Sequence, residues 1–328
     1  MARQFPQAAG APIYGPTVIP PRFYSDFLKK YYRTTVLKSI CNTEFDKDIT
    51  GYGDILNVSQ LPDMELFDYY EGMALSTQQN FFKSDVQLKI DQAKGWRVPM
   101  NPVFNKQTMH KDFWSRMADD GAKKINIAID KTVLAGFAAL ANASNVGATA
   151  GVVTQSWDLG TVGSAKTITP DACVPLLLAM EQVLFEQDIM ADPDGGSDGV
   201  NEDEMYAVVP GWFKSYLMQA KVLQAWLSGD AKSPIRTNSV GHVGNMVIHV
   251  SNNLPYTTAT KTSPILFGVK KATSFALQLQ VAETKDHPTD YGKIMQALTV
   301  WGWNVMIDKG VGAAYVKPGA LVGPAVEG

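Results

Sequence analysis

The acidic stretch at residues 191–204, ADPDGGSDGVNEDE, holds residue types that could bind a metal ion. Clustered carboxylates are ligands that Ca²⁺ prefers, and an EF-hand loop adds a glycine at its sixth position. A loop that starts at Asp192 has Ser197 at the sixth position, and one that starts at Asp194 has Gly196 at the third position, where a ligand should be. The stretch therefore favours a solvated acidic loop over a specific calcium site.

The four histidines are the other candidates for proton transfer or metal binding. They are His110, His242, His249 and His287, and their spacing matches no metal-ligand motif. His242 and His249 are seven residues apart, so an unbroken strand would place them on opposite faces. The P-loop, dinucleotide-binding, zinc-protease and nucleophile-elbow motifs do not occur in the sequence. We therefore expect no catalytic residue, no cofactor and no metal, and the chain is predicted not to be an enzyme.

The bulk composition is typical of a folded protein without a membrane span. The chain has 328 residues, of which 45% are hydrophobic and 19% charged, and its formal net charge is −3. This composition excludes a mainly disordered chain, and no stretch reaches the roughly 18 apolar residues needed to cross a bilayer. No dense basic tail indicates tight nucleic-acid binding, although weak contact stays open. Cys41 and Cys173 are the only cysteines, and we expect buried thiols in a reducing compartment.

The N-terminal forty residues predict an arm followed by a short helix. Residues 1–21 are rich in proline, alanine and glycine and lack the apolar core of a secretory signal. Residues 22–40 mix aromatic side chains with lysine and arginine, which favours a helix with a basic face. That face has two interpretations, contact with solvent or contact with a partner's acidic surface or DNA.

Alternating apolar residues predict strands between residues 49 and 100. DILNVSQL alternates, and SDVQLKIDQAK places Val86, Leu88 and Ile90 on one face. The connector between them, PDMELFDYYEGMALSTQQNFFK, is long for a loop inside a compact domain. Its aromatic residues are Phe67, Tyr69, Tyr70, Phe81 and Phe82. This excursion packs either on another subunit or on its own domain, and both interpretations stay open.

A helical period of apolar residues predicts a long helix over residues 111–142. Gly121 occupies a gap in the apolar stripe, and two acid-before-base pairs, Asp119 with Lys123 and Asp120 with Lys124, support its polar side. A helix of this length is a rod of about 45 Å. The small residues after it, at 143–169, mark a candidate domain boundary.

The second half of the chain mixes helices and strands, so the fold class is α+β. Thr169 and Pro170 begin a helix that is expected to bury Val174, Leu177, Leu178, Leu184 and Phe185. A strand at MYAVV precedes a helix from Trp212 to about Leu227. Further strands are expected at 245–250, 265–269, 275–281, 293–307 and 313–316. The first of these ends in a turn at Ser-Asn-Asn-Leu-Pro.

Several local phrases occur in an order that resembles a known family. They are GYGDILNV, the Leu88-x-Ile90-Asp91 phrase, AVVPGWF, and the Gly-x-x-Gly turn and SNNLP ending of VGHVGNMVIHVSNNLP. Taken together, the segments resemble the major capsid proteins of tailed bacteriophages, the Caudoviricetes, whose Hong Kong ninety-seven fold is also seen in encapsulins.

The resemblance implies a division of the chain into capsid elements. The expected parts are an N-terminal arm and short helix (1–42), an extended β-hairpin loop (43–100), a peripheral domain (101–168) with its spine helix (111–142), an axial domain (169–260), and return strands to both domains (261–328). The acidic stretch would lie near the capsomer axis. No scaffold-like domain precedes the arm, so a separate scaffolding protein or a processed form is expected. We match no lysine or asparagine to the cross-linking site of some relatives.

The resemblance also implies function and partners. We expect a structural protein of the virion capsid, assembled in the host cytoplasm as hexamers and pentamers of an icosahedral shell around double-stranded DNA. The expected partners are other copies of the chain, a scaffolding protein, a portal protein, a possible cement protein and weakly held DNA, with no membrane. Intersubunit contacts are expected from the five excursion aromatics and, in the arm, from Phe5, Tyr14 and Phe23. The alternatives are an encapsulin-like compartment and a cytosolic α+β enzyme of unrecognised chemistry.

Overall fold

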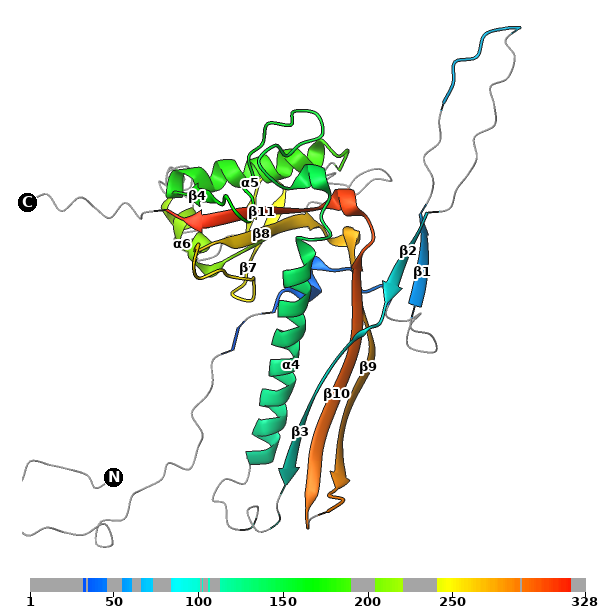
Figure 1. The fold of residues 1–328 in the computed structure, drawn as a ribbon, viewed down its shortest axis with the longest axis vertical. Coiled ribbons are helices and arrows are strands. Elements are labelled where there is room, and N and C mark those ends of the chain that lie inside the picture. Colours follow the sequence, from blue (N-terminus) through cyan, green and yellow to red (C-terminus); the bar gives the residue numbers. More distant parts are fainter. Residues whose placement is uncertain are drawn as a thin grey trace, which may run out of the picture.

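The computed structural model describes residues 32–33, 35–45, 55–60, 66–72, 84–100, 102, 106, 113–189, 204–220, 241–289 and 291–319. These residues form a six-stranded sheet, a three-stranded sheet and a two-stranded hairpin, with helices packed on them. Figure 1 shows the six-stranded sheet at one end and the long three-stranded sheet extending away from it, with one long helix alongside.

The six-stranded mixed sheet has the strand order β4, β11, β8, β5, β7, β6. Its strands are Lys166–Ile168 (β4), Val311–Pro318 (β11), Ser263–Val269 (β8), Met205–Val209 (β5), Met246–Val250 (β7) and His242–Val243 (β6). The central strands β8 and β5 are buried at every residue, as expected for apolar strands that are covered on both faces. Helices α5 (Pro170–Phe185) and α6 (Gly211–Gln219) contact each other and share one hydrophobic core with this sheet. The strand predicted at MYAVV and the strand before the SNNLP turn are confirmed.

The three-stranded antiparallel sheet has the order β3, β10, β9, with bounds Gln92–Met100, Lys293–Val305 and Thr273–Asp286. Helix α4 (Phe113–Phe137) lies along it (Figure 1). Ile125, Ile129 and Val133 of α4 form a buried cluster with Trp301 of β10. The gap in the apolar stripe at Gly121 has a steric cause, because a Cβ there would lie 2.5 Å from ring atoms of Trp96.

The long helix ends earlier than the sequence predicts, at Phe137 instead of residue 142. The backbone then makes tight turns, in which Ala139 N donates to Gly136 O and Leu140 N donates to Phe137 O, both at 3.2 Å. The Asn142 side chain then caps a separate short 3₁₀ helix by accepting a hydrogen bond from Ser144 N. Local capping therefore overrides the apolar period beyond Phe137.

The short α1 helix (Leu37–Ile40) is also smaller than the helix predicted over residues 22–40. Among the described residues of that range, helical structure begins only at Leu37. The amides of Val36 and Leu37 both donate to the side chain of Asp130 in α4, at 3.0 and 3.2 Å. A carboxylate from a distant part of the chain therefore caps this helix and sets where it starts.

Two further predictions about the helices need correction. Leu178 of α5 is 47% exposed, because Pro175, Leu178 and Gln182 form the solvent stripe of that helix, and Phe185 is only half-buried. Helix α6 ends at Gln219, since the backbone of Ala220 is extended (φ −60°, ψ 128°). The predicted continuation through Leu223 to Leu227 lies outside the described residues.

The β1–β2 hairpin (Ile55–Gln60 and Ser84–Lys89) is antiparallel, with Leu56 opposite Leu88. Leu88 is fully buried against Ala276 and Met306, while Val86 and Ile90 of the same face pack partly against this cluster. The predicted apolar face is confirmed. The hairpin base is therefore anchored to the rest of the protein beside β9.

The late strands differ from the predicted bounds at their ends. β9 and β11 extend beyond the predicted 275–281 and 313–316, and β10 ends at Val305 instead of Ile307. Met306 N and Ile307 N both donate to Ala272 O, which pulls the chain out of the sheet and into a short 3₁₀ turn at Asp308–Gly310.

Candidate functional site

The described part of the chain brings no metal-binding cluster together. Within those residues, no three side chains among histidine, cysteine, aspartate and glutamate lie close enough to hold a metal ion. Both cysteines are buried, as predicted, and burial raises the pKa of Cys41 and Cys173 to about 12. No helix in the described ranges is long and apolar enough to cross a membrane.

His242 and His249 lie on one face of the β6–β7 hairpin, not on opposite faces. The strand is broken by a turn in which Gly244 adopts a positive φ of 59°, and the register pairs His242 with Val247. Val247 and His249 share a face because they are two residues apart on β7. His249 is partly buried, and burial lowers its pKa, while His287 is also partly buried and His110 lies outside the described residues.

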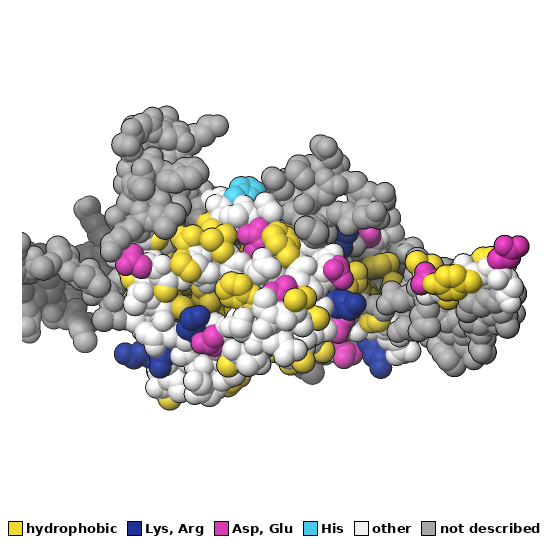
Figure 2. Space-filling model, turned by 90° about the horizontal axis from the view of Figure 1, so that it is seen from above, with side chains coloured by type: hydrophobic (Ala, Val, Ile, Leu, Met, Phe, Trp, Pro, Cys, Tyr) yellow, Lys and Arg dark blue, Asp and Glu magenta, His cyan; other side chains and the backbone are white. Residues whose placement is uncertain are grey.

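Exposed aromatic side chains gather in the described segment of the long excursion, residues 66–72, which we name the tip segment. Leu66, Phe67, Tyr69 and Tyr70 are 96%, 54%, 66% and 68% exposed. In Figure 2 the apolar and acidic side chains at the far right belong to this projection. A cluster of large exposed apolar side chains is typical of a protein interaction site.

The other predicted contact residues cannot be placed. Phe81 and Phe82 of the excursion, and Phe5, Tyr14 and Phe23 of the arm, lie outside the described residues. Much of the acidic stretch is also outside them, although Glu204, at its end, forms a 3.3 Å ion pair with Lys271.

A buried polar network fixes the N-terminal segment and the SNNLP turn to α4. Asp130 is fully buried; its Oδ1 accepts from the amides of Val36 and Leu37, and its Oδ2 accepts from Asn253 Nδ2 at 2.6 Å. The Asp130 carboxylate therefore joins residues from three distant parts of the sequence. The predicted turn residue Asn253 has a structural role here that the sequence alone does not indicate.

A second contact of the N-terminal segment lies further along α4. Tyr32 donates from its hydroxyl to Asp120 Oδ1 at 2.7 Å, and Lys124 Nζ lies 3.1 Å from Asp120 Oδ2. Lys123 lies over the Tyr32 ring, 4.7 Å from its centroid. The predicted pair of Asp120 with Lys124 is confirmed, but Asp120 itself is buried and not on a solvated face.

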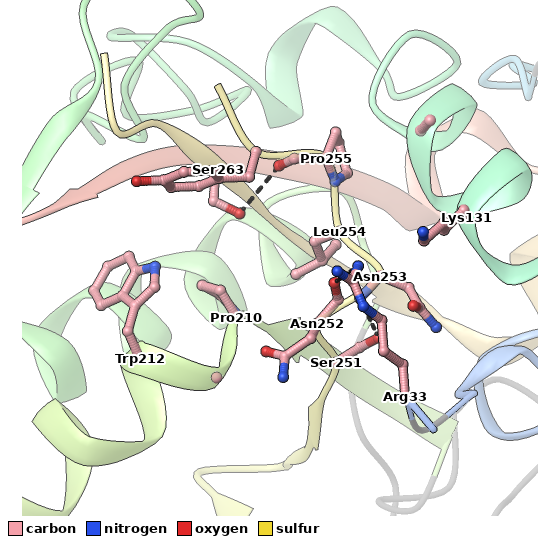
Figure 3. A pocket seen from close by; sticks show the side chains of 13 residues that line it. Arg33, Lys131, Pro210, Trp212, Ser251, Asn252, Asn253, Leu254, Pro255 and Ser263 are labelled. Carbon is pink, nitrogen blue, oxygen red and sulfur yellow. Dashed lines mark hydrogen bonds between the residues drawn. The ribbon is translucent and has the colours of Figure 1, made fainter. Parts of the chain in front are cut away.

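A pocket of about 570 Å³ opens where the N-terminal segment, α4, the start of α6 and the β7–β8 turn meet. Figure 3 shows Arg33 and Lys131 on one side of it and Trp212 on the other. Arg33 Nη1 donates to Asn252 O at 2.7 Å. Sequence reasoning missed this pocket, because its walls come from four segments whose proximity only the fold creates.

Comparisons with known proteins give matches among solved structures only. No family model matches, and no curated protein matches. A structure from Mycobacterium phage Che8 is 19% identical, covers 90% of this chain and 96% of that chain, and has a TM-score of 0.69. The capsid structure of cyanophage P-SCSP1u is 15% identical, covers 97% of this chain and 100% of that chain, and has a TM-score of 0.67. The mature capsid of bacteriophage PhiM1 is 14% identical, covers 92% of each chain, and has a TM-score of 0.62. The chain therefore has the fold of these phage capsid structures, which confirms the α+β capsid fold predicted from the sequence.

Proposed function

We propose that this chain is the major capsid protein of a tailed bacteriophage and that it assembles into hexamers and pentamers of an icosahedral shell around double-stranded DNA. The observation that carries the proposal is the extent of the fold match, which takes in at least nine-tenths of this chain and of each of the three structures compared. A match of that extent leaves little of the chain for an unrelated function. Its role is structural and not enzymatic.

The proposed shell contacts agree with the shape of the molecule. Phe67, Tyr69 and Tyr70 are exposed on a projection that has no described neighbour to bury them (Figure 1). A shell protein makes heterologous contacts with several copies of itself, and such contacts close into rings and cages. We assign Phe81 and Phe82, with Phe5, Tyr14 and Phe23 of the arm, to the same set of intersubunit contacts.

The capsid elements are assigned as follows. The peripheral domain contains α4 and the β3–β10–β9 sheet, the axial domain contains the six-stranded sheet with α5 and α6, and the excursion between β1 and β2 is the extended loop. The division at 1–42, 43–100, 101–168, 169–260 and 261–328 remains a prediction, with β9 and β10 as the return strands to the peripheral domain. At its boundaries, β3 ends the range 43–100 but pairs with the peripheral sheet, and β4 ends the range 101–168 but pairs with the axial sheet.

The proposed partners are other copies of the chain, a separate scaffolding protein, a portal protein and a possible cement protein. The packaged DNA would be held weakly, since the formal net charge of −3 favours an inner wall without a strong grip on phosphate. The site of action is the virion shell, assembled in the host cytoplasm.

Electron microscopy and sedimentation of the full chain, expressed alone and with a candidate scaffolding protein, test the proposal. We expect capsomers or uniform closed shells in at least one of the two conditions. A discrete small oligomer in both would overturn it, and nuclease-protected DNA in shells from infected cells separates a genome container from a protein-cargo compartment.

A further inference from the structure

The pocket described above has walls that would suit a segment both apolar and acidic. Leu254, Tyr256 and Trp212 supply apolar surface. Figure 3 shows Trp212 across the pocket from Arg33 and Lys131. Its volume of about 570 Å³ is in the range of pockets that enclose large side chains or small ligands. The pocket is thus large enough to accept an aromatic side chain together with its backbone.

The polar groups of the pocket are donors. Arg33 uses one guanidinium N–H on Asn252 O, and the others are available because a guanidinium carries five. Lys131 is exposed on α4 at the pocket wall, and none of the described residues that line the pocket is acidic. The indole Nε1 of Trp212 is buried and has no acceptor within the described residues. The donors that an occupant can reach are therefore those of Arg33 and Lys131, and they favour an occupant with carboxylate groups.

The tip segment has the complementary chemistry. Residues 66–72 read LFDYYEG and contain two acidic residues and no basic one. Within the described part, Asp68 and Glu71 are exposed beside Tyr69 and Tyr70. Figures 1 and 2 place the tip segment far from the rest of the described chain, so the pocket of the same copy is out of its reach.

We propose that the tip segment of one copy docks into this pocket of a neighbouring copy, which rests on the proposed self-assembly. Asp68 and Glu71 pair with Arg33 and Lys131, and a tyrosine ring of the tip fills the apolar part. Opposite charges across such a contact fix its register and reject wrong partners.

A charge swap tests the contact. Lys131→Glu or Glu71→Lys alone should lower the yield of shells roughly tenfold, because like charges then meet, and the combination should restore most of it. Lys309→Glu, the same charge change on an exposed lysine outside the pocket, is the matched control and should assemble normally. Thermal unfolding of each variant shows that the subunit still folds, since Lys131 and Glu71 are both exposed.

Disulfide trapping gives a second readout. Shells that carry Tyr69→Cys with Tyr256→Cys should form covalent ladders on oxidation, while Tyr69→Cys with Val153→Cys, an exposed site away from the pocket, should not. The natural cysteines Cys41 and Cys173 are buried, so we expect them to form no cross-link on oxidation.

The outcomes separate this inference from the proposed function. The docking site would be overturned, and the capsid function left standing, by either of two results. One is a normal shell yield from both Lys131→Glu and Glu71→Lys, and the other is a combination of the two that restores no yield. If Lys131→Glu lowers the yield of shells and Glu71→Lys does not, the tip segment is not the occupant, and another segment or a small anion fills the pocket. Failure of the wild type to form any shell would overturn the capsid function itself.

Discussion

Asp130 is the residue at which three distant segments of the chain meet. It is fully buried and accepts hydrogen bonds from Val36 N, Leu37 N and Asn253 Nδ2. Hydrogen bonds to a charged acceptor are stronger than neutral ones, and buried donors left without a partner are costly. The network is therefore expected to hold the N-terminal segment and the SNNLP turn against α4.

The Asp130→Ala substitution should lower the free energy of unfolding by about 3 kcal/mol, because it leaves buried donors without acceptors. Urea unfolding of the unassembled subunit measures the change. Asp119→Asn, which alters an exposed carboxylate on the same helix, is the control and should change the free energy of unfolding by less than about 0.5 kcal/mol. If Asp130→Ala changes the free energy of unfolding as little as Asp119→Asn is expected to, the network does not contribute to stability.

Glu186 provides a pH-dependent contribution at the same scale. Burial acts to raise its pKa, but hydrogen bonds from the backbone and hydroxyl of Thr154, from Val153 N and from Trp157 Nε1 together hold that pKa below its usual value. A lowered pKa in the folded state stabilises the fold above the unfolded-state pKa, and the contribution is lost as the pH falls through the folded-state value.

Glu186→Gln should therefore be less stable than the wild type at neutral pH, and the difference should shrink on acidification below about pH 4. Urea unfolding from neutral to acidic pH measures both curves. If the two curves run parallel across that range, the hydrogen bonds to Glu186 do not carry the pH dependence.

At the scale of elements, the packing of α4 on the three-stranded sheet depends on small residues facing tryptophans. A Cβ at Gly136 would lie 2.6 Å from the ring of Trp303, much as one at Gly121 would meet Trp96. The two glycines let the helix approach the sheet closely. Helix propensity alone would favour alanine at both positions.

Gly121→Val should destabilise the subunit by about 2 kcal/mol, because overpacking against Trp96 outweighs the gain in helix propensity. Adding Trp96→Leu removes the ring and should recover part of the loss. Chemical denaturation of the single and double variants decides the matter, and a Gly121→Val subunit as stable as the wild type would contradict the close approach.

The elements that sequence patterns predict well are those with a strong period. The apolar face of β2, the start of α5 and the strand at MYAVV follow directly from the local sequence. The end of α4 does not, because local turns and the Asn142 cap end it. The start of α1 does not either, because Asp130 caps that helix from a position 94 residues away from Val36 in the sequence. The sequence places Asp120 on the polar side of α4, and it does not indicate that Tyr32 covers and buries this residue.

At the scale of the whole molecule, the prediction with the widest reach concerns the excursion. Replacing Tyr69, Tyr70, Phe81 and Phe82 with serine should leave a folded subunit that assembles poorly, because the described tyrosines make no contact that folding needs. Unfolding measurements and particle counts by electron microscopy separate the two effects. Normal particles from this variant would show that the aromatics are not shell contacts.

The fold class and the order of the elements could be predicted at this scale, because each local phrase of the sequence falls where a fold of this kind needs it. The pocket between Arg33, Lys131 and Trp212 could not, since nothing in the spacing of these residues relates them. A docking surface built from four segments is a property of the assembled tertiary structure, and the sequence shows only its separate parts.

The position of β11 in the six-stranded sheet has a consequence for protein synthesis. This strand, Val311–Pro318, lies between β4 and β8, pairing with β4 in parallel and with β8 in antiparallel register. Sheets built from such distant pairings form slowly, and here the sheet is incomplete until Pro318 has left the ribosome. A chain that terminates before Val311 therefore lacks an interior strand, and we expect it to fail to complete this sheet.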